Sequence, residues 1–307
     1  MRDNYIGNEI TRECTLCPRR CGVDRTSGSL GFCGEGYALR VARIAPHYFE
    51  EPPISGKRGS GAIFFSGCSL RCVFCQNRDI SRHGGNGRVM SDGELYDAMI
   101  ALSQSGVHNI NLVTPTHFLH RIIPLLERAK TSGELRVPVV YNTSGYESVE
   151  SLKRLEGLVD IYMPDLKYYS SDIAEKYSKA PAYLTVASAA LLEMHRQVRG
   201  CVYSQEEPDI LAKGLIVRHL VLPSHRHDSM AVLEHLAKLL PADSFLLSLM
   251  SQYTPEFALD TPYRELHRRV TSFEYGKVAE RAAQLGFEGF IQERSSANKA
   301  FTPNFKE

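Results

Sequence analysis

The chain lacks an apolar run long enough to span a membrane, and its first residues, Met1 to Tyr5, contain no apolar core of a signal peptide. It also lacks a strong charge of either sign, since 36 Lys and Arg residues against 35 Asp and Glu residues give a formal net charge of +1. This balance gives no electrostatic reason to expect a nucleic acid or an anionic membrane as a partner. We therefore expect a cytoplasmic protein.

Length and composition fit an ordinary globular protein. The 307 residues suffice for one large domain of α/β-barrel size or two smaller ones, and 43% are hydrophobic against 23% charged. Eight cysteines in a reducing compartment do not predict a disulfide framework. Seven of them lie before residue 76, and only Cys201 is isolated, which is typical of a packed thiol. The clustered cysteines therefore carry the functional information.

Three of them, Cys68, Cys72 and Cys75, follow the apolar run 62–65 with the spacing C-x3-C-x2-C. Three thiolates on one tight loop suit an iron–sulfur cube that keeps one iron free of protein ligands. A cluster that only carries electrons normally has four cysteine ligands, so the missing fourth ligand indicates a different task for that iron. The alternatives are a zinc site or cysteines that pack in a core.

A second group, Cys14, Cys17, Cys21 and Cys33, lies in a short segment rich in Gly and Arg. Such a segment has too little core to fold alone, and this spacing is typical of a metal knuckle. Zinc and a second iron–sulfur cluster are both compatible with four thiolates; the alternative is reduced cysteines in a docked extension. Prolines in 45–54 indicate an extended connector. We expect a metal-binding segment and connector over 1–55 and a barrel over 56–307.

Beyond residue 60, strand and helix patterns alternate. Apolar runs typical of strands cover 62–65, 109–113, 137–141, 159–163, 215–222 and 245–250, and 290–292 offers a further short pairing. Helical patterns lie between them, and Ser91 with Glu94 predicts a capping box at the start of the first. Six such units with no hairpin signal predict an α/β fold, a partial (β/α)6 parallel barrel with a small cysteine-rich N-terminal extension.

Polar side chains stand where each predicted strand ends, which is where ligand-binding groups gather in parallel barrels. The first strand leads to the three cysteines. The later strands lead to the polar stretches 114–117, 142–145, 165–167, 223–225 and 251–253, and Arg218 lies within the fifth strand. This pattern predicts an active-site mouth.

The cysteine loop, with aromatic Phe74 before its third cysteine, resembles that of the radical S-adenosylmethionine (SAM) superfamily. The resemblance covers residues 60–255 and is strongest to the pyruvate formate-lyase activating enzyme type. It implies one [4Fe-4S] cluster whose open iron binds the amine and carboxylate of SAM. It also implies reductive cleavage of SAM to a 5′-deoxyadenosyl radical that abstracts a hydrogen atom.

Two later stretches carry the resemblance further. Met163-Pro-Asp-Leu-Lys167 is similar to the fourth-strand segment of the activating enzymes, which implies that Asp165 and Lys167 help to hold the methionine end of SAM. An amino acid zwitterion needs both signs of charge nearby; the alternative is a strand-end ion pair. Arg218, which leads to Pro223, matches the fifth-strand pattern, although an outer-face position is the alternative.

Two turns depart from the family pattern. The stretch Asn142-Thr-Ser144-Gly stands where activating enzymes carry an acidic residue followed by Thr-Asn-Gly, so a monovalent-cation site there would depend on the Asn142 carbonyl. The stretch Thr114-Pro-Thr116-His117 replaces a Gly-Gly-Glu turn whose backbone receives the methionine amine. A backbone carbonyl still accepts from an ammonium group, but proline removes one donor. The chain thus resembles a divergent subgroup.

The leading hypothesis is a radical SAM enzyme with a flavodoxin- or ferredoxin-type reductant, acting on the glycine of a glycyl radical enzyme. A small metabolite or a peptide is the alternative target. An electron-transfer protein with two clusters and a zinc-stabilised binding module are hypotheses from other classes. Gln252 and Tyr253 are candidate substrate contacts, and we assign no catalytic role to His117, His225 or His227.

Overall fold

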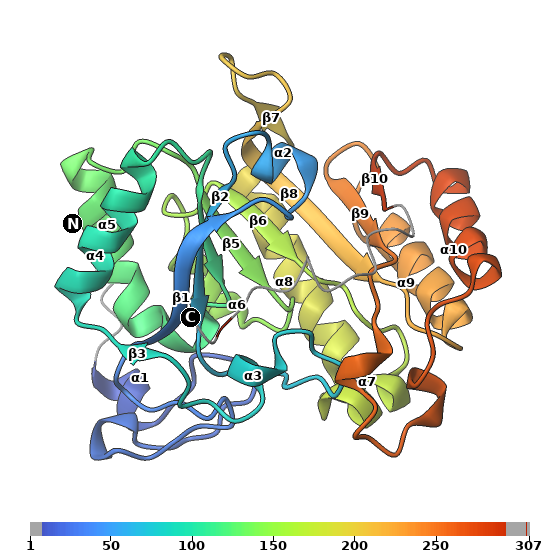
Figure 1. Ribbon diagram of the computed structural model, residues 1–307, viewed down its shortest axis with the longest axis horizontal. Helices are drawn as coiled ribbons and strands as arrows, with labels where there is room; N and C mark the ends of the chain where they lie inside the picture. Colours follow the sequence, from blue (N-terminus) through green and yellow to red (C-terminus); the bar gives the residue numbers. More distant parts are fainter. Residues whose placement is uncertain (1–7, 293–304, 306–307) are drawn as a thin grey trace.

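The computed structural model describes residues 8–292 and residue 305. Within them a sheet of ten strands runs in the order β10-β9-β8-β6-β5-β4-β2-β1-β3, with β7 paired to β8 outside this path. The stretch from β2 to β10 is parallel, and β1, β3 and β7 pair antiparallel. Helices cover the outer face of this curved sheet (Figure 1).

The strands have the following bounds. They are β1 (Arg40–His47), β2 (Ser60–Phe65), β3 (Arg88–Val89), β4 (Ile110–Val113), β5 (Val139–Thr143), β6 (Ile161–Pro164), β7 (Val202–Tyr203), β8 (Leu211–Leu220), β9 (Leu246–Met250) and β10 (Gly289–Ile291).

The helices fall between and around the strands. The α-helices are α1 (Asn8–Arg12), α2 (Pro52–Ser55), α3 (Arg78–Ser81), α4 (Asp92–Gln104), α5 (Leu119–Ser132), α6 (Val149–Lys153), α7 (Ser171–Ser178), α8 (Tyr183–Val198), α9 (Arg226–Leu239) and α10 (Ser272–Gln284). Four short 3-10 helices are η1 (Arg25–Ser27), η2 (Thr116–Phe118), η3 (Pro255–Phe257) and η4 (Arg264–Leu266).

Alternation along the strands separates two kinds of interior. In β8, Leu215 and Val217 pack outward into the large core beneath the helices, whereas Ile216 points into the lumen, where it packs with Val140 of β5. Successive residues of a strand face opposite sides, so Arg218, two residues after Ile216, also faces the lumen. The lumen therefore has an apolar layer near the strands' amino ends and polar groups near their carboxyl ends.

Most of the predicted architecture is confirmed. The six predicted strands correspond to β2, β4, β5, β6, β8 and β9, all joined by parallel pairing, and β10 adds the short pairing expected near 290–292. The capping box of Ser91 and Glu94 opens α4, with Ser91 Oγ accepting from the Glu94 amide at 3.2 Å. The fold is an α/β partial barrel.

The interpretation of 45–54 as a connector is wrong. Residues 45–47 belong to β1, which pairs antiparallel with β2, and Pro52–Ser55 forms α2. Pro46 is tolerated because β3 pairs only with Arg40 and Val41, so at Pro46 β1 is an edge strand. Ile54 of α2 is fully buried against the apolar layer of the lumen, so this stretch closes the amino end of the barrel.

The predicted boundary at residue 55, between a metal-binding segment with its connector and the barrel, remains a prediction. β1 lies before this boundary and pairs with β2 of the barrel sheet. Among the described residues, no helix combines the length and the apolar character that crossing a membrane requires.

Candidate functional site

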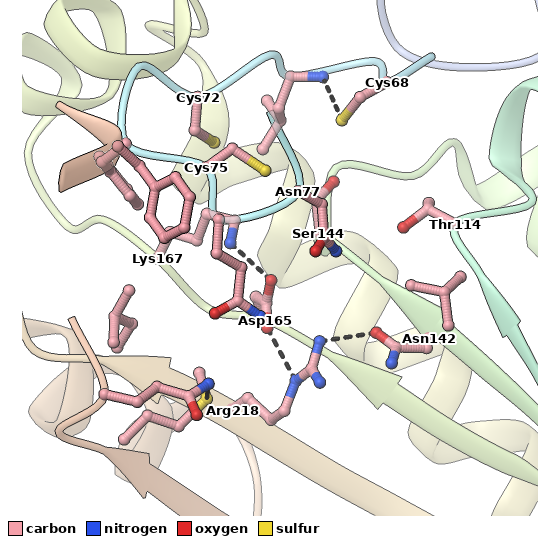
Figure 2. A pocket seen from close by; sticks show the side chains of 18 of the residues that line it. Cys68, Cys72, Cys75, Asn77, Thr114, Asn142, Ser144, Asp165, Lys167 and Arg218 are labelled. Atoms are coloured by element: carbon pink, nitrogen blue, oxygen red, sulfur yellow. Dashed lines mark hydrogen bonds and ion pairs between the residues drawn. The ribbon is translucent and has the colours of Figure 1, made fainter. Parts of the chain in front are cut away.

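A cavity opens at the carboxyl ends of the parallel strands. Figure 2 shows the three cysteines of the loop after β2 on one side of it and a chain of charged and amide groups on the other. The predicted site residues that line it are Cys68, Cys72, Phe74, Cys75, Thr114, Asn142, Ser144, Asp165, Lys167 and Arg218. Residues from five strand ends therefore meet in one place.

The cysteine loop is shaped so that donors face its sulfurs. Gly67 has φ +82°, and a Cβ there would lie 2.6 Å from the Cys33 carbonyl oxygen, so only glycine fits this turn. The Leu70 amide donates to Cys68 Sγ at 3.3 Å, and Ser178 Oγ donates to Cys72 Sγ at 3.0 Å. Donors aimed at sulfur favour the thiolate, which is the form that binds a metal.

Charged groups form a continuous chain across the cavity (Figure 2). Lys167 Nζ lies 2.5 Å from Asp165 Oδ2, and Arg218 Nε donates to Asp165 Oδ1 at 2.9 Å. Arg218 also donates to Asn142 Oδ1 at 2.6 Å. All four side chains are largely buried, so these contacts hold the carboxyl ends of β5, β6 and β8 in one arrangement.

Neighbouring charges keep the side chains of Asp165 and Lys167 ionised. Burial alone would raise the pKa of Asp165, but the Arg218 guanidinium and the Lys167 ammonium hold it below its usual value. Burial alone would lower the pKa of Lys167, but the Asp165 carboxylate keeps it above its usual value. Both signs of charge therefore persist beside the cysteines, as a zwitterionic ligand requires.

Two buried polar atoms at the cavity have no hydrogen-bond partner among the described residues. They are Ser144 Oγ, from the turn after β5, and Asn77 Oδ1, from the end of the cysteine loop. A buried polar atom without a partner costs free energy, so each is available to a ligand. Ser144 was expected at this place from the sequence and Asn77 was not.

Thr116 does not share this cavity lining. Its hydroxyl donates to Glu147 Oε1 at 2.6 Å, and Tyr141 donates to Glu147 Oε2 at 3.2 Å. Burial raises the pKa of Glu147 to about 7, although these hydrogen bonds oppose the shift. Glu147 thus ties η2 to the end of β5, and Thr116 positions this turn instead of lining the cavity.

The side-chain carbonyl of Asn142 accepts from Arg218, so the guanidinium supplies positive charge next to it. This charge disfavours a monovalent cation at the same oxygen, and a cation site there remains a prediction. Arg218 lines the cavity, so it does not lie on the outer face of the barrel, which was the alternative that the sequence left open.

Aromatic and amide groups complete the wall. The Phe74 ring packs edge-on against Tyr177 and Tyr253, with centroids 6.2 and 6.1 Å apart. Gln252 and Tyr253 line the cavity, as expected of substrate contacts. His117 instead lies buried outside it, with Nε2 2.6 Å from the Ser66 carbonyl.

A second cavity adjoins the first and shares Asn142, Arg218 and Gln252 with it. Glu50 and Glu51, from the segment between β1 and α2, line this cavity. Glu50 Oε2 lies 3.5 Å from Arg218 Nη1, and Glu51 Oε2 is buried with no hydrogen-bond partner among the described residues. Burial raises the pKa of both carboxyl groups, although Arg218 opposes the shift.

Sequence reasoning missed Glu50 and Glu51 because they fall in the stretch interpreted as a connector. Two adjacent acids directly before Pro-Pro were the available signal. The four N-terminal cysteines lie outside both cavities. Within residues 8–292, no three His, Cys, Asp or Glu side chains are placed to share a single metal ion.

Comparison with known protein families identifies the superfamily to which the barrel segment is similar. Residues 62–203 match the radical SAM superfamily. This part of the chain belongs to the radical SAM superfamily. Membership implies a [4Fe-4S] cluster and SAM, and the three thiols, the mixed charges and the unpartnered Ser144 hydroxyl fit these groups. Arg218 and Gln252 lie beyond the matched segment of the radical SAM domain.

Two uncharacterized proteins of Methanocaldococcus jannaschii are similar to the chain. One is 29% identical over 291 residues, which are 92% of this chain and 78% of that protein. The other is 27% identical over 183 residues, and the match covers 54% of this chain and 52% of that protein. Neither carries an assigned activity.

Two solved structures resemble the fold. Methylornithine synthase (PylB) has a TM-score of 0.50 at 16% identity, covering 75% of this chain and 66% of that one. A domain of a pyruvate-formate lyase-activating enzyme from Bacteroides vulgatus has a TM-score of 0.40 at 12% identity, covering 57% and 92%. The first supports the barrel fold of the radical SAM domain.

Proposed function

We propose that the protein is an enzyme that reductively cleaves SAM at a [4Fe-4S] cluster held by Cys68, Cys72 and Cys75. The observation that carries the proposal is the single cavity in which these thiols face a buried Lys167–Asp165–Arg218 chain. When bound, the cluster and SAM supply a 5′-deoxyadenosyl radical that abstracts a hydrogen atom.

The residues that line the cavity would bind SAM and orient it. The ammonium of Lys167 offers a donor to a carboxylate, and the Ser144 hydroxyl offers a donor or an acceptor to the amino acid end of SAM. The negative charge of Asp165 offsets the positive charges of Lys167 and Arg218. A ligand that carries both signs of charge therefore enters a site whose own buried charges are already paired. Phe74 and Tyr253 cover the site with apolar surface, which limits the access of water.

We propose a protein glycine as the target of hydrogen abstraction, with a flavodoxin- or ferredoxin-type reductant in the cytoplasm. The support is the similarity of Met163-Pro-Asp-Leu-Lys167 and of the cysteine loop to the activating enzymes. A glycyl radical enzyme would then be the partner of this chain.

A small polar substrate is the second candidate, and the adjoining cavity favours it. Glu50 and Glu51 project into a chamber that continues from the cluster side of the barrel, past Arg218. An unpartnered carboxylate oxygen there suits a substrate that carries an ammonium group or several hydrogen-bond donors.

Anaerobic reconstitution with iron and sulfide, followed by reduction and addition of SAM, tests the reaction. We expect 5′-deoxyadenosine from the wild type and from Cys201→Ala, and none from Cys72→Ala. Wild-type protein that carries the full complement of iron and forms no 5′-deoxyadenosine would contradict the proposal and favour the electron-transfer alternative.

A further inference from the structure

The N-terminal segment gathers its four cysteines behind the catalytic loop. Cys14, Cys17 and Cys33 are buried, and Cys21 is partly buried. A Cβ at Gly31 would lie 3.2 Å from Cys21 Sγ and 3.4 Å from Cys33 Sγ, so both sulfurs lie close to this backbone and would have to shift to admit a side chain.

Tight turns bring three of these cysteines together. The Gly22 amide donates to the Cys14 carbonyl and the Cys14 amide to the Val23 carbonyl, each at 3.1 Å. The Arg20 amide donates to the Cys17 carbonyl at 3.0 Å. Cys14, Cys17 and Cys21 therefore lie on one compact loop.

Arg25 supplies the decisive observation. Its side chain is 1% exposed and donates from Nη2 to Cys33 Sγ at 3.1 Å, and its Nε has no hydrogen-bond partner among the described residues. No carboxylate of residues 8–292 is recorded in an ion pair with it. A buried guanidinium without an opposite charge is costly. Four neutral thiols supply no such charge, whereas a metal centre with four thiolates does.

The same segment contacts the catalytic loop directly. The Cys68 amide donates to the Cys33 carbonyl at 3.2 Å, which places one residue of each cysteine group in contact. Arg19 donates to the carbonyls of Ser69 and Ser178, each at 2.8 Å. Arg25 donates to the His117 carbonyl at the turn after β4. The N-terminal segment therefore packs against the loop that holds the catalytic cysteines.

We propose that Cys14, Cys17, Cys21 and Cys33 bind an iron–sulfur cluster that braces the catalytic cysteine loop. Binding of the cluster releases four thiol protons to solvent and leaves a net charge of about −2 next to Arg25. Each thiolate of a cluster binds its own iron, so a cluster does not require four sulfurs around one point. The bracing role rests on the proposed function of the catalytic loop, and the metal site does not.

Metal analysis of the full chain tests the site. A Cys68/Cys72/Cys75→Ala variant, reconstituted with iron and sulfide, should keep about four irons and four sulfides. Adding Cys14→Ala and Cys17→Ala should remove them. Equal iron content in the triple and quintuple variants, or a single zinc in place of iron, would overturn the proposal.

Two glycine substitutions give a test that spares every ligand. Gly31→Ala places a Cβ against two sulfurs, whereas Gly36→Ala in the same segment meets only Leu30 Cδ2 at 3.4 Å and Ser29 O at 3.7 Å. Neither position has a positive φ, so backbone strain does not separate them. We expect Gly31→Ala to lose the N-terminal metal to a chelator several-fold faster than the wild type, and Gly36→Ala to match the wild type. Equal rates for both variants would overturn the site.

The bracing role has its own readout. In a Cys14→Ala/Cys17→Ala double variant that retains Cys68, Cys72 and Cys75, we expect reduced iron at the catalytic loop and a weakened response of its electron paramagnetic resonance (EPR) spectrum to SAM. Cys201→Ala should match the wild type in both. A double variant with full catalytic iron and an unchanged SAM response would overturn the brace. A wild type without any SAM response contradicts the proposed function instead.

Discussion

Asp165 is the residue on which the charge balance of the cavity depends. It pairs with Lys167 and Arg218 at once, and all three side chains are largely buried. We predict that Asp165→Asn weakens SAM binding about tenfold, a loss of about 1.4 kcal/mol, because Lys167 and Arg218 lose the carboxylate that holds them at the cavity. Equilibrium dialysis of the reconstituted protein against SAM measures this.

Asp92→Asn is the matched control for this prediction. It also removes a carboxylate from an ion pair, in which Asp92 Oδ1 lies 2.7 Å from Arg121 Nε, but that pair is at the start of α4 and outside the cavity. SAM binding should match that of the wild type. Equal losses in the two variants would show that Asp165 has no special place in binding.

The raised pKa of Glu147 makes the stability of the fold depend on pH. Its pKa is raised to about 7 in the folded chain, mainly by burial, and a glutamate in an unfolded chain titrates near 4.3. The folded state thus holds a proton that the unfolded state releases, so this contribution to stability is present below about pH 4 and is lost as pH rises toward 7.

We predict that the free energy of unfolding of Glu147→Gln, relative to wild type, increases by roughly 2 to 3 kcal/mol between pH 5 and pH 8. Denaturant unfolding at both pH values measures the difference. A relative stability that stays constant over this range would contradict the raised pKa.

The limits of sequence reasoning are clearest at this scale. Asp165, Lys167 and Arg218 could be predicted because they lie at strand ends, and strand ends follow from local patterns. Glu50 could not, because its contact with Arg218 joins residues 168 positions apart across the barrel. The role of Glu147 depends on donors from separate turns, which no local pattern brings together.

At the scale of elements, the turns after β5 and β6 pack without space between them. Gly145 has φ +76°, and a Cβ there would lie 2.1 Å from the Asp165 carbonyl oxygen. We predict that Gly145→Ala lowers both stability and SAM affinity, because it displaces the backbone that carries Asp165. Thermal unfolding and SAM dialysis measure the two effects.

Gly157→Ala is the control that separates the steric clash of a new Cβ from the cost of a left-handed backbone. Gly157 has φ +81° and no neighbour within 4 Å of a Cβ, so alanine there meets only the left-handed backbone penalty of about 1 to 2 kcal/mol. Its SAM affinity should equal that of the wild type. If Gly145→Ala loses no more stability than Gly157→Ala, the packing of the two turns does not position Asp165.

The elements also show why β1 was missed. The parallel strands could be predicted because each is an apolar run between helical patterns. β1 is an edge of that parallel set, only partly buried along most of its length, and it contains Pro46, so its local pattern reads as a connector. Its pairing with β2 is a contact that only the folded chain defines.

At the scale of the whole molecule, the barrel and the cysteine-rich segment meet at the catalytic loop. The strands deliver polar groups to one end of the lumen, α2 closes the other end, and the N-terminal segment lies against the loop from outside (Figure 1). The barrel could be predicted from periodicity. The contact between Cys33 and Cys68 could not, because it depends on how the two parts dock.

The EPR spectrum of the reduced, reconstituted protein before and after addition of SAM tests the central claim most directly. If Cys68, Cys72 and Cys75 hold a cluster whose open iron faces Lys167 and Asp165, SAM should change the signal of that cluster in the wild type and in Gly36→Ala. The change should be absent in Cys72→Ala. A wild type with full iron occupancy and a spectrum indifferent to SAM would contradict the account.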